Sequence, residues 1–436
     1  MGLNPRHLAL RAVDVSLAAA TVIAGAVVLT ALRPRRRGSR SAARPRLMAF
    51  STTSSLRVLR SRKSEHIVTH RDLGGYFEHV WTVHPLVGAD PGEPRQQSTG
   101  PPTITRLNDA HTVVEGHTRR FASLEHLPYL DFALAQLGLL LALERIISRE
   151  GVGIVRGDPF YNGLLAVLLG KLCGRPVELR VIADHDAIYE TVGTLAHPRL
   201  FKTRAVQQRV IRQTLSRADL VVLGTPAYRD FVTRNGARED RLAVVGNWSM
   251  INPVHLGEPD EREPLGDEFG FGDRPVVACI SRLEPMKHPE DVVLAVAQAH
   301  ARDPRVALVL VGEGAMREEL ERLCAEHGIA DAVAFAGDRD QQWIARLLAQ
   351  AAMVVAPLAG LSLVESALSG TPIVAYDYEW HAELIQSEQE GILVPYRDVD
   401  ALAAAIGAVL ADPARGARLG AALRARLVDV MQPDHL

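Results

Sequence analysis

Short apolar runs alternate with amphipathic stretches along most of the chain, and this pattern predicts alternating strands and helices. In the second half the runs are nearly continuous, which is typical of strands buried on both faces of a parallel sheet. The runs span 275–280, 306–311, 333–337, 353–356 and 373–376, with helices expected at 291–301, 315–326 and 344–351. This order predicts an α/β fold with a Rossmann-like doubly wound sheet.

The first half shows the same alternation with longer irregular connections, including a proline-rich stretch at 84–105. A single core rarely grows past about 250–300 residues, so 436 residues predict two domains. We expect an anchor with an arginine-rich flank at 1–47, a tether at 48–63, a domain at 64–257, a linker at 258–272 and a second domain at 273–436.

The amino terminus has a different pattern from the rest. Residues 12–32 are almost wholly apolar, long enough for a helix to cross a hydrocarbon core of about 30 Å. Seven arginines follow within 33–46, and the positive-inside rule then places the later domains in the cytoplasm. We expect a single-pass anchor in the cell membrane, with the arginines against its anionic surface. A helix lying on that surface and a processed leader are the alternatives.

Charge and cysteine content exclude several classes. The net charge of −2 argues against a nucleic-acid-binding polycation. Cys173, Cys279 and Cys324 lie far apart without a C-x-x-C pair, so we expect reduced core thiols, no disulfide framework and no metal cluster.

The stretch 351–377 predicts a strand, a loop, a helix and a second strand. Gly360 lies where backbone can approach a ligand closely, and the helix start near Ser362 offers unpaired amides to an anion. Glu365, one turn in, has a carboxylate able to accept two ribose hydroxyls. An ordinary βαβ unit with a C-cap glycine is the alternative.

Two cations follow the first strand of the second domain. Arg282 and Lys287 are placed to bind a diphosphate, the arginine through two parallel hydrogen bonds and the lysine as a point charge. A solvated turn is the alternative. The next apolar strand ends in Gly312-Glu-Gly314.

In the first domain, the sequence 65–78 predicts an opening strand that runs into the loop Gly74-Gly75, the usual place of a phosphate loop. Asp184-His185-Asp186 follows the strand 177–183, at the sheet edge that binds ligands. Three interpretations of this triplet are possible. It could contact an acceptor hydroxyl, hold a divalent metal with its two carboxylates, or form a polar turn that caps the next helix.

Taken as a set, Arg282 with Lys287, the Gly312-Glu-Gly314 turn, Phe335-Ala-Gly337 and the block from Gly360 through Glu365 to Gly370 resemble retaining glycosyltransferase family four. The resemblance covers about 150 residues of the second half and, more loosely, the first. It implies the GT-B fold, in which two Rossmann-like domains face a cleft. The domain at 64–257 would take the acceptor and the domain at 273–436 the nucleotide sugar.

The resemblance also implies roles for individual residues. Arg282 and Lys287 would contact the donor diphosphate and be catalytic. From its position after a strand we also expect His185 to be catalytic, and Asp184 and Asp186 to bind the acceptor. Donor contacts would come from Gly74, Gly75, Gly312, Gly314, Gly360, Leu361, Ser362, Leu363 and Glu365. No metal and no cofactor are expected. The donor would be a UDP- or GDP-sugar, and the acceptor a saccharide or a lipid-linked precursor of a surface polysaccharide.

Two departures from the family pattern motivate other functions. Pro357 stands where the family usually has the first of two glutamates, and the chain stops at residues 431–436 without the usual final crossover helix. A membrane-tethered protein that binds a nucleotide sugar without turnover is therefore one alternative. A sugar-nucleotide epimerase of the same fold is another, although no matching carboxylate and histidine set is found.

Overall fold

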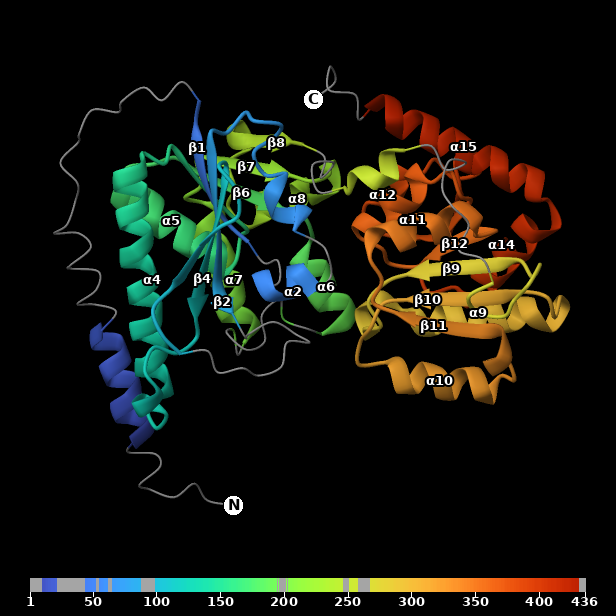
Figure 1. Ribbon diagram of the computed structural model, residues 1–436, viewed down its shortest axis with the longest axis horizontal. Coiled ribbons are helices and arrows are strands. Elements are labelled where there is room, and N and C mark those ends of the chain that lie inside the picture. The colour runs from blue at the N-terminus through green and yellow to red at the C-terminus, as the bar shows by residue number, and fades with distance from the viewer. Residues whose placement is uncertain are drawn as a thin grey trace. The chain divides into compact units, whose positions relative to one another are not determined.

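The computed structural model of the protein describes residues 10–21, 44–51, 55–61, 65–87, 99–193, 195, 201, 203–245, 251–257 and 267–430. The chain forms two compact units, residues 1–61 with 65–246 (unit 1) and residues 62–64 with 247–436 (unit 2). Each unit contains a sheet flanked by helices (Figure 1).

Unit 1 is built on an eight-stranded sheet of order β3-β4-β2-β1-β5-β6-β7-β8, parallel except for the β3–β4 pair. Its strands are β1 (Arg46–Phe50), β2 (His79–Val87), β3 (Thr103–Arg106), β4 (His111–His117), β5 (Ile154–Gly157), β6 (Val177–Val181), β7 (Leu220–Leu223) and β8 (Leu242–Val244). Besides a helix at residues 10–21, its α-helices are α2 (Leu56–Ser61), α3 (His66–Thr69), α4 (Pro128–Glu150), α5 (Tyr161–Cys173), α6 (His185–Val192), α7 (Arg204–Leu215) and α8 (Arg229–Arg234).

Unit 2 is built on a six-stranded, all-parallel sheet of order β11-β10-β9-β12-β13-β14. Its strands are β9 (Val276–Ile280), β10 (Ala307–Val311), β11 (Val333–Gly337), β12 (Met353–Ala356), β13 (Ile373–Asp377) and β14 (Ile392–Pro395). Its α-helices are α9 (Pro289–Arg302), α10 (Arg317–Glu326), α11 (Gln341–Gln350), α12 (Leu361–Leu368), α13 (His381–Leu384), α14 (Val399–Ala411) and α15 (Pro413–Val430). The strand order reverses between β9 and β12, which makes their carboxyl ends the expected ligand position.

The second sheet explains the continuous apolar runs. Val277 and Cys279 of β9 pack into one cluster and Ala278 into another, so both faces of the strand are covered. Tyr376 of β13 is fully buried, and its hydroxyl donates a hydrogen bond of 2.7 Å to Asp291 Oδ2. The strands expected in this half are therefore all present.

The membrane anchor expected at the amino terminus is wrong. Among the described ranges, the structure contains no helix with the length and apolar character needed to cross a membrane. Residues 10–21 are helical, and residues 22–43 lie outside the described part. Asp14, within the apolar run, is 2% exposed and accepts hydrogen bonds from the amides of Tyr129 (3.1 Å) and Leu130 (2.8 Å) at the start of α4. Contact with an anionic membrane surface stays a prediction.

The beginning of the first sheet also differs from the expectation. The strand expected within residues 65–78 does not form; this stretch contains α3 and a series of turns. The first strand is β1, inside the segment expected to be an anchor and a tether, because Leu47 to Phe50 are buried between β2 and β5. Unit 1 ends at residue 246, earlier than the expected 257. Residues 258–266 of the expected linker and the terminal residues 431–436 lie outside the described part.

Candidate functional site

Three neighbouring strands of unit 2 have polar or glycine residues just past their carboxyl ends. Arg282 and Lys287 follow β9, residues 360–362 follow β12, and Glu379 follows β13. Because β9, β12 and β13 are adjacent and parallel, these loops share one edge of the sheet. The point where the strand order reverses lies at this edge.

The loop after β9 is held against the loop after β10. The amide of Leu283 donates to the carbonyl of Glu313 at 3.0 Å. A Cβ at Gly312 would lie 2.1 Å from the Ser281 carbonyl oxygen, and one at Gly314 would lie 2.2 Å from that of Leu283. Contact between the two loops therefore requires glycine at both positions. A contact between these glycines and a donor stays a prediction.

Lys287 and Arg282 form a pair of like charges. Lys287 is half-buried at the end of the turn Pro285–Lys287. Burial and, to a smaller extent, the positive charge of Arg282 lower its pKa to about 8, against the opposing negative charge of Glu379. Arg282 is exposed, with Nη2 3.9 Å from Met286 Sδ. An anion bound by both cations would relieve their repulsion.

Helix α12 begins at the same edge, directly after Gly360. A Cβ at Gly360 would meet no atom within 4 Å, so packing does not require glycine there. The first amides of a helix have no intrahelical partners and favour an anion. Leu363 is fully buried and its amide donates to the Gly360 carbonyl at 3.0 Å, so this turn offers a ligand the amides of Leu361 and Ser362 and the half-buried side chain of Ser362.

Glu365 is the buried acid of this edge. It is 7% exposed, and within the described residues its carboxyl group has no hydrogen bond or ion pair. Burial raises its pKa to about 7. An ionisable group buried without a protein partner is costly, and such groups concentrate where a ligand completes the site. A ribose offers two hydroxyl donors for one carboxylate.

Sequence reasoning missed two residues after β13, Glu379 and His381. His381 is fully buried; its Nδ1 lies 2.9 Å from the Tyr376 carbonyl oxygen and its Nε2 3.3 Å from that of Ala359. It therefore joins the end of β13 to the loop before α12. Burial lowers the pKa of His381, and the charge of Lys287 contributes to the lowering. The signal was available, since both are polar residues that follow a buried strand.

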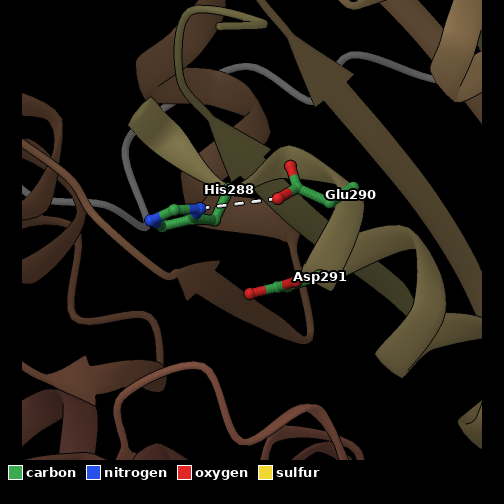
Figure 2. Close-up of side chains that lie close together, drawn as sticks. All are labelled: His288, Glu290 and Asp291. Atoms are coloured by element: carbon green, nitrogen blue, oxygen red, sulfur yellow. Dashed lines mark hydrogen bonds and ion pairs between the residues drawn. The ribbon is translucent and has the colours of Figure 1, made fainter. Parts of the chain in front are cut away.

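A second cluster lies beside Lys287. Figure 2 shows His288, Glu290 and Asp291, whose potential ligand atoms lie within 4.8 Å of one another. The guanidinium of Arg397 lies where a metal ion would bind, with Nη1 2.7 Å from Glu290 Oε1 and 3.0 Å from Asp291 Oδ2. His288 Nε2 is 2.8 Å from the Tyr396 hydroxyl. The cluster thus fixes His288, which has a left-handed backbone (φ 53°) directly after Lys287.

In unit 1, Asp184, His185 and Asp186 follow β6 as expected, but both carboxylates have partners. Asp184 caps α6 by accepting from two amides of its first turn, and it accepts from Arg234 Nη2 at 2.7 Å. Asp186 accepts from Asn235 Nδ2 at 3.0 Å. Arg234 supplies the positive charge that a metal would bring, and this favours the capping role over a metal site.

The ring of His185 packs edge-on against Phe160, with the centroids 4.1 Å apart. This contact holds the imidazole near the carboxyl end of β6. Recognition of an acceptor by His185, Asp184 and Asp186 stays a prediction.

Gly74 and Gly75 lie at the other edge of the sheet. They precede β2, and the carbonyl of Gly75 accepts a hydrogen bond of 3.1 Å from Arg44, which precedes β1. Their φ values of 65° and 88° lie in the left-handed region that favours glycine, so the turn alone accounts for glycine at both positions. The structure does not bring them to the carboxyl edge where Asp184 lies, so the expected phosphate loop has no support here.

Two units, each with a mostly or wholly parallel sheet flanked by helices, define a two-domain Rossmann-like α/β protein of the GT-B type. The model of the family described as glycosyl transferases group 1 matches residues 262–426. The GDP-mannose-dependent alpha-(1-6)-phosphatidylinositol monomannoside mannosyltransferase of Mycolicibacterium smegmatis is 33% identical over 284 residues, covering 61% of this chain and 70% of that protein. The chain belongs to the family of glycosyl transferases group 1.

Solved structures show the same fold. Sucrose-phosphate synthase from Thermosynechococcus elongatus superposes with a TM-score of 0.65 at 19% identity, covering 89% of this chain and 95% of that one. Anabaena HepE in complex with UDP and glucose gives a TM-score of 0.65 at 18% identity, covering 88% and 95%. At these identities the likeness supports the GT-B fold alone.

Proposed function

We propose that the protein transfers a sugar from a nucleoside-diphosphate sugar to an acceptor hydroxyl, with retention of configuration at the anomeric carbon. One observation carries the proposal. The cations Arg282 and Lys287 lie at the same sheet edge as the start of α12, and Glu365 is buried there without a protein partner. A diphosphate and a ribose are chemically complementary to these groups.

Each group has a defined role in this reaction. The bond between the anomeric carbon and the donor phosphate oxygen breaks, and negative charge builds on the leaving diphosphate. Arg282, Lys287 and the first amides of α12 stabilise that charge from fixed positions, the type of effect that supplies much of an enzyme's rate enhancement. The acceptor oxygen bonds to the anomeric carbon on the same face, and its proton passes to the leaving phosphate oxygen.

GDP-mannose is the first donor to test. The mycobacterial relative is named for its dependence on GDP-mannose, and its sequence identity to this chain exceeds that of the UDP-bound structures. UDP-sugars remain the second class. Glu365 would hold the ribose of either donor, so this residue does not select the base.

A lipid-linked acceptor fits the same relative, which is named for a phosphatidylinositol monomannoside. We propose that unit 1 binds this acceptor near the carboxyl end of β6, with His185 facing the reacting hydroxyl. A phosphoinositol lipid carries both hydroxyls and a phosphate, and both groups need polar partners in the protein.

The test combines binding with product analysis. The purified protein is mixed with GDP-mannose, UDP-glucose and UDP-N-acetylglucosamine in turn, and the melting temperature is measured, since a bound ligand stabilises the folded state. The stabilising donor is then incubated with phosphatidylinositol vesicles. Release of nucleoside diphosphate together with a glycosylated lipid is expected. Binding without release would support the non-catalytic alternative, and a changed sugar nucleotide without acceptor would support an epimerase.

A further inference from the structure

Three arginines gather near the carboxyl edge of the unit 1 sheet, apart from the residues discussed so far. Arg156 belongs to β5, Arg180 to β6, and Arg71 to the turns after α3. In the strand register Ala49 lies opposite Arg156, and Arg156 lies opposite Glu178. Side chains at paired positions, and at positions two residues apart, point to one face of a sheet. Arg156, Glu178 and Arg180 therefore share a face.

Arg71 reaches the same place from outside the sheet. Its Nη2 donates a hydrogen bond of 2.6 Å to Ser51 Oγ, just past the end of β1, and its Nε donates to the Ile67 carbonyl at 3.0 Å. Burial and, to a smaller extent, the positive charges of Arg156 and Arg180 lower the pKa of Arg71 to about 10. The three guanidinium groups are thus within electrostatic reach of one another.

The cluster has more positive than negative charge. Glu178 pairs with Arg156, at 2.9 Å from Glu178 Oε2 to Arg156 Nη2 and 2.8 Å from Oε1 to Nε. Arg180 Nε is buried and has no hydrogen-bond partner, and no ion pair of Arg180 is found among the described residues. Three cations therefore face one carboxylate, and the donors of Arg180 remain available to an anion.

We propose that Arg180, with Arg71 and Arg156, forms a subsite for a phosphate group of the acceptor. Guanidinium groups match phosphate oxygens through paired hydrogen bonds, and each bond to an ionised group is stronger than a neutral one. The subsite lies on β6, the strand that also leads to His185. The inference rests on the proposed function, in which the donor diphosphate is bound by unit 2.

The energetics of the free protein distinguish a binding role from a structural one. A structural arginine is matched by acceptors and stabilises the fold, whereas an unmatched, half-buried cation beside two others destabilises it. Replacing Arg180 by glutamine should therefore leave the ligand-free melting temperature unchanged or raise it, as is common when a functional charge is removed. A melting temperature below that of wild type would indicate a structural role and overturn the proposal.

Binding is tested with inorganic phosphate on the full chain. The protein is first saturated with GDP, and in a parallel arm with UDP, so that the proposed donor site is filled. Inorganic phosphate is then added to about 10 mM, and the rise in melting temperature gives its affinity. Arg180→Gln should weaken this affinity at least about tenfold, as expected for a lost charge-assisted pair. The control Arg209→Gln, an exposed position on α7, should respond as wild type.

Two outcomes of this titration would overturn the proposal. One is an equal phosphate response of the Arg180→Gln and wild-type proteins. The other is loss of the phosphate response on saturation with GDP or UDP, because the donor itself would then occupy the subsite.

A kinetic arm separates this inference from the proposed function. With phosphatidylinositol vesicles as acceptor, Arg180→Gln should raise the acceptor KM at least about tenfold and leave slow donor hydrolysis without acceptor unchanged. An unchanged acceptor KM would overturn the subsite. If the wild-type protein hydrolyses no donor and transfers no sugar, the proposed function fails, while the phosphate titration still decides whether the anion site exists.

Discussion

Arg397, just past β14, bonds to Glu290 in the first turn of α9 at 2.7 Å. The same guanidinium lies 3.0 Å from Asp291, which is 2% exposed. The contact matters for the proposed site because α9 begins two residues after Lys287. The ion pairs of Arg397 with Glu290 and Asp291 thus stabilise the start of α9 and, with it, the adjoining loop that carries Lys287, a residue proposed to act in catalysis.

Removing this arginine is expected to affect both stability and activity. Arg397→Met leaves two carboxylates without their counter-charge, and the free energy of unfolding should fall by about 1–2 kcal/mol, as is usual for buried polar groups that lose a partner. A displaced Lys287 should lower donor kcat/KM about tenfold. Urea unfolding and initial rates check the two effects. Arg305→Met, which breaks an exposed pair with Asp303, is the control and should change neither.

The two cations are expected to act mainly on turnover. Arg282→Ala and Lys287→Ala should each lower kcat at least about a hundredfold, because each removes a charge that stabilises the leaving diphosphate. Arg322→Ala on α10, whose partner is Glu326 within the same helix, serves as the matched control. Turnover near the wild-type value in either site variant would remove that residue from the proposed chemistry.

The pKa values of Lys287 and Glu365 predict a bell-shaped pH profile of donor kcat/KM. Below a pH of about 7, Glu365 is protonated and loses the charge that accepts ribose hydroxyls. Above a pH of about 8, Lys287 loses the charge that binds the diphosphate. Initial rates from pH about 5.5 to 9.5 should therefore peak between about 7 and 8. Lys287→Arg should move the alkaline limb upward; a flat profile would contradict both roles.

We expect the buried carboxyl group of Glu365 to lower the free energy of unfolding of the ligand-free protein and to strengthen donor binding. Its folded-state pKa of about 7 lies above the ordinary value of 4.5, so the folded protein loses stability as pH rises through this interval. Glu365→Gln should therefore raise the free energy of unfolding at pH 8 by about 1–3 kcal/mol, and the gain should vanish near pH 4.5. The same variant should weaken donor binding at least about tenfold. Glu318→Gln, exposed on α10, should show neither effect.

Two glycines of unit 2 should respond to alanine in opposite ways. Gly360→Ala places a methyl group in open space, so the melting temperature should change little while a ligand that approaches this backbone is hindered. Gly312→Ala places it 2.1 Å from the Ser281 carbonyl oxygen at a φ of 127°, and should cost several kcal/mol, roughly the range of severe core overpacking. Thermal unfolding and donor titration separate the two. Equal donor affinity of Gly360→Ala and wild type would argue against a ligand at that turn.

Sequence alone identified five of the six strands of the second sheet; the edge strand β14 was not among them. A continuous apolar run such as 306–311 is stable only when helices cover both faces of the strand. Its hydrophobic pattern therefore identifies it as a central strand of a parallel sheet. Arg282, Lys287 and Glu365 could be selected for the same local reason, because each lies a few residues past a strand whose end is unambiguous.

The remaining features needed the tertiary structure. Strand order brings Glu379 and His381 beside Lys287, and no local pattern states which strands are neighbours. The apolar run at 12–32 suggested a membrane, yet Asp14 is satisfied by the amides of α4, more than a hundred residues later in the chain. Burial, pairing and charge compensation between distant segments are properties of the folded chain, since they depend on contacts that sequence spacing does not encode.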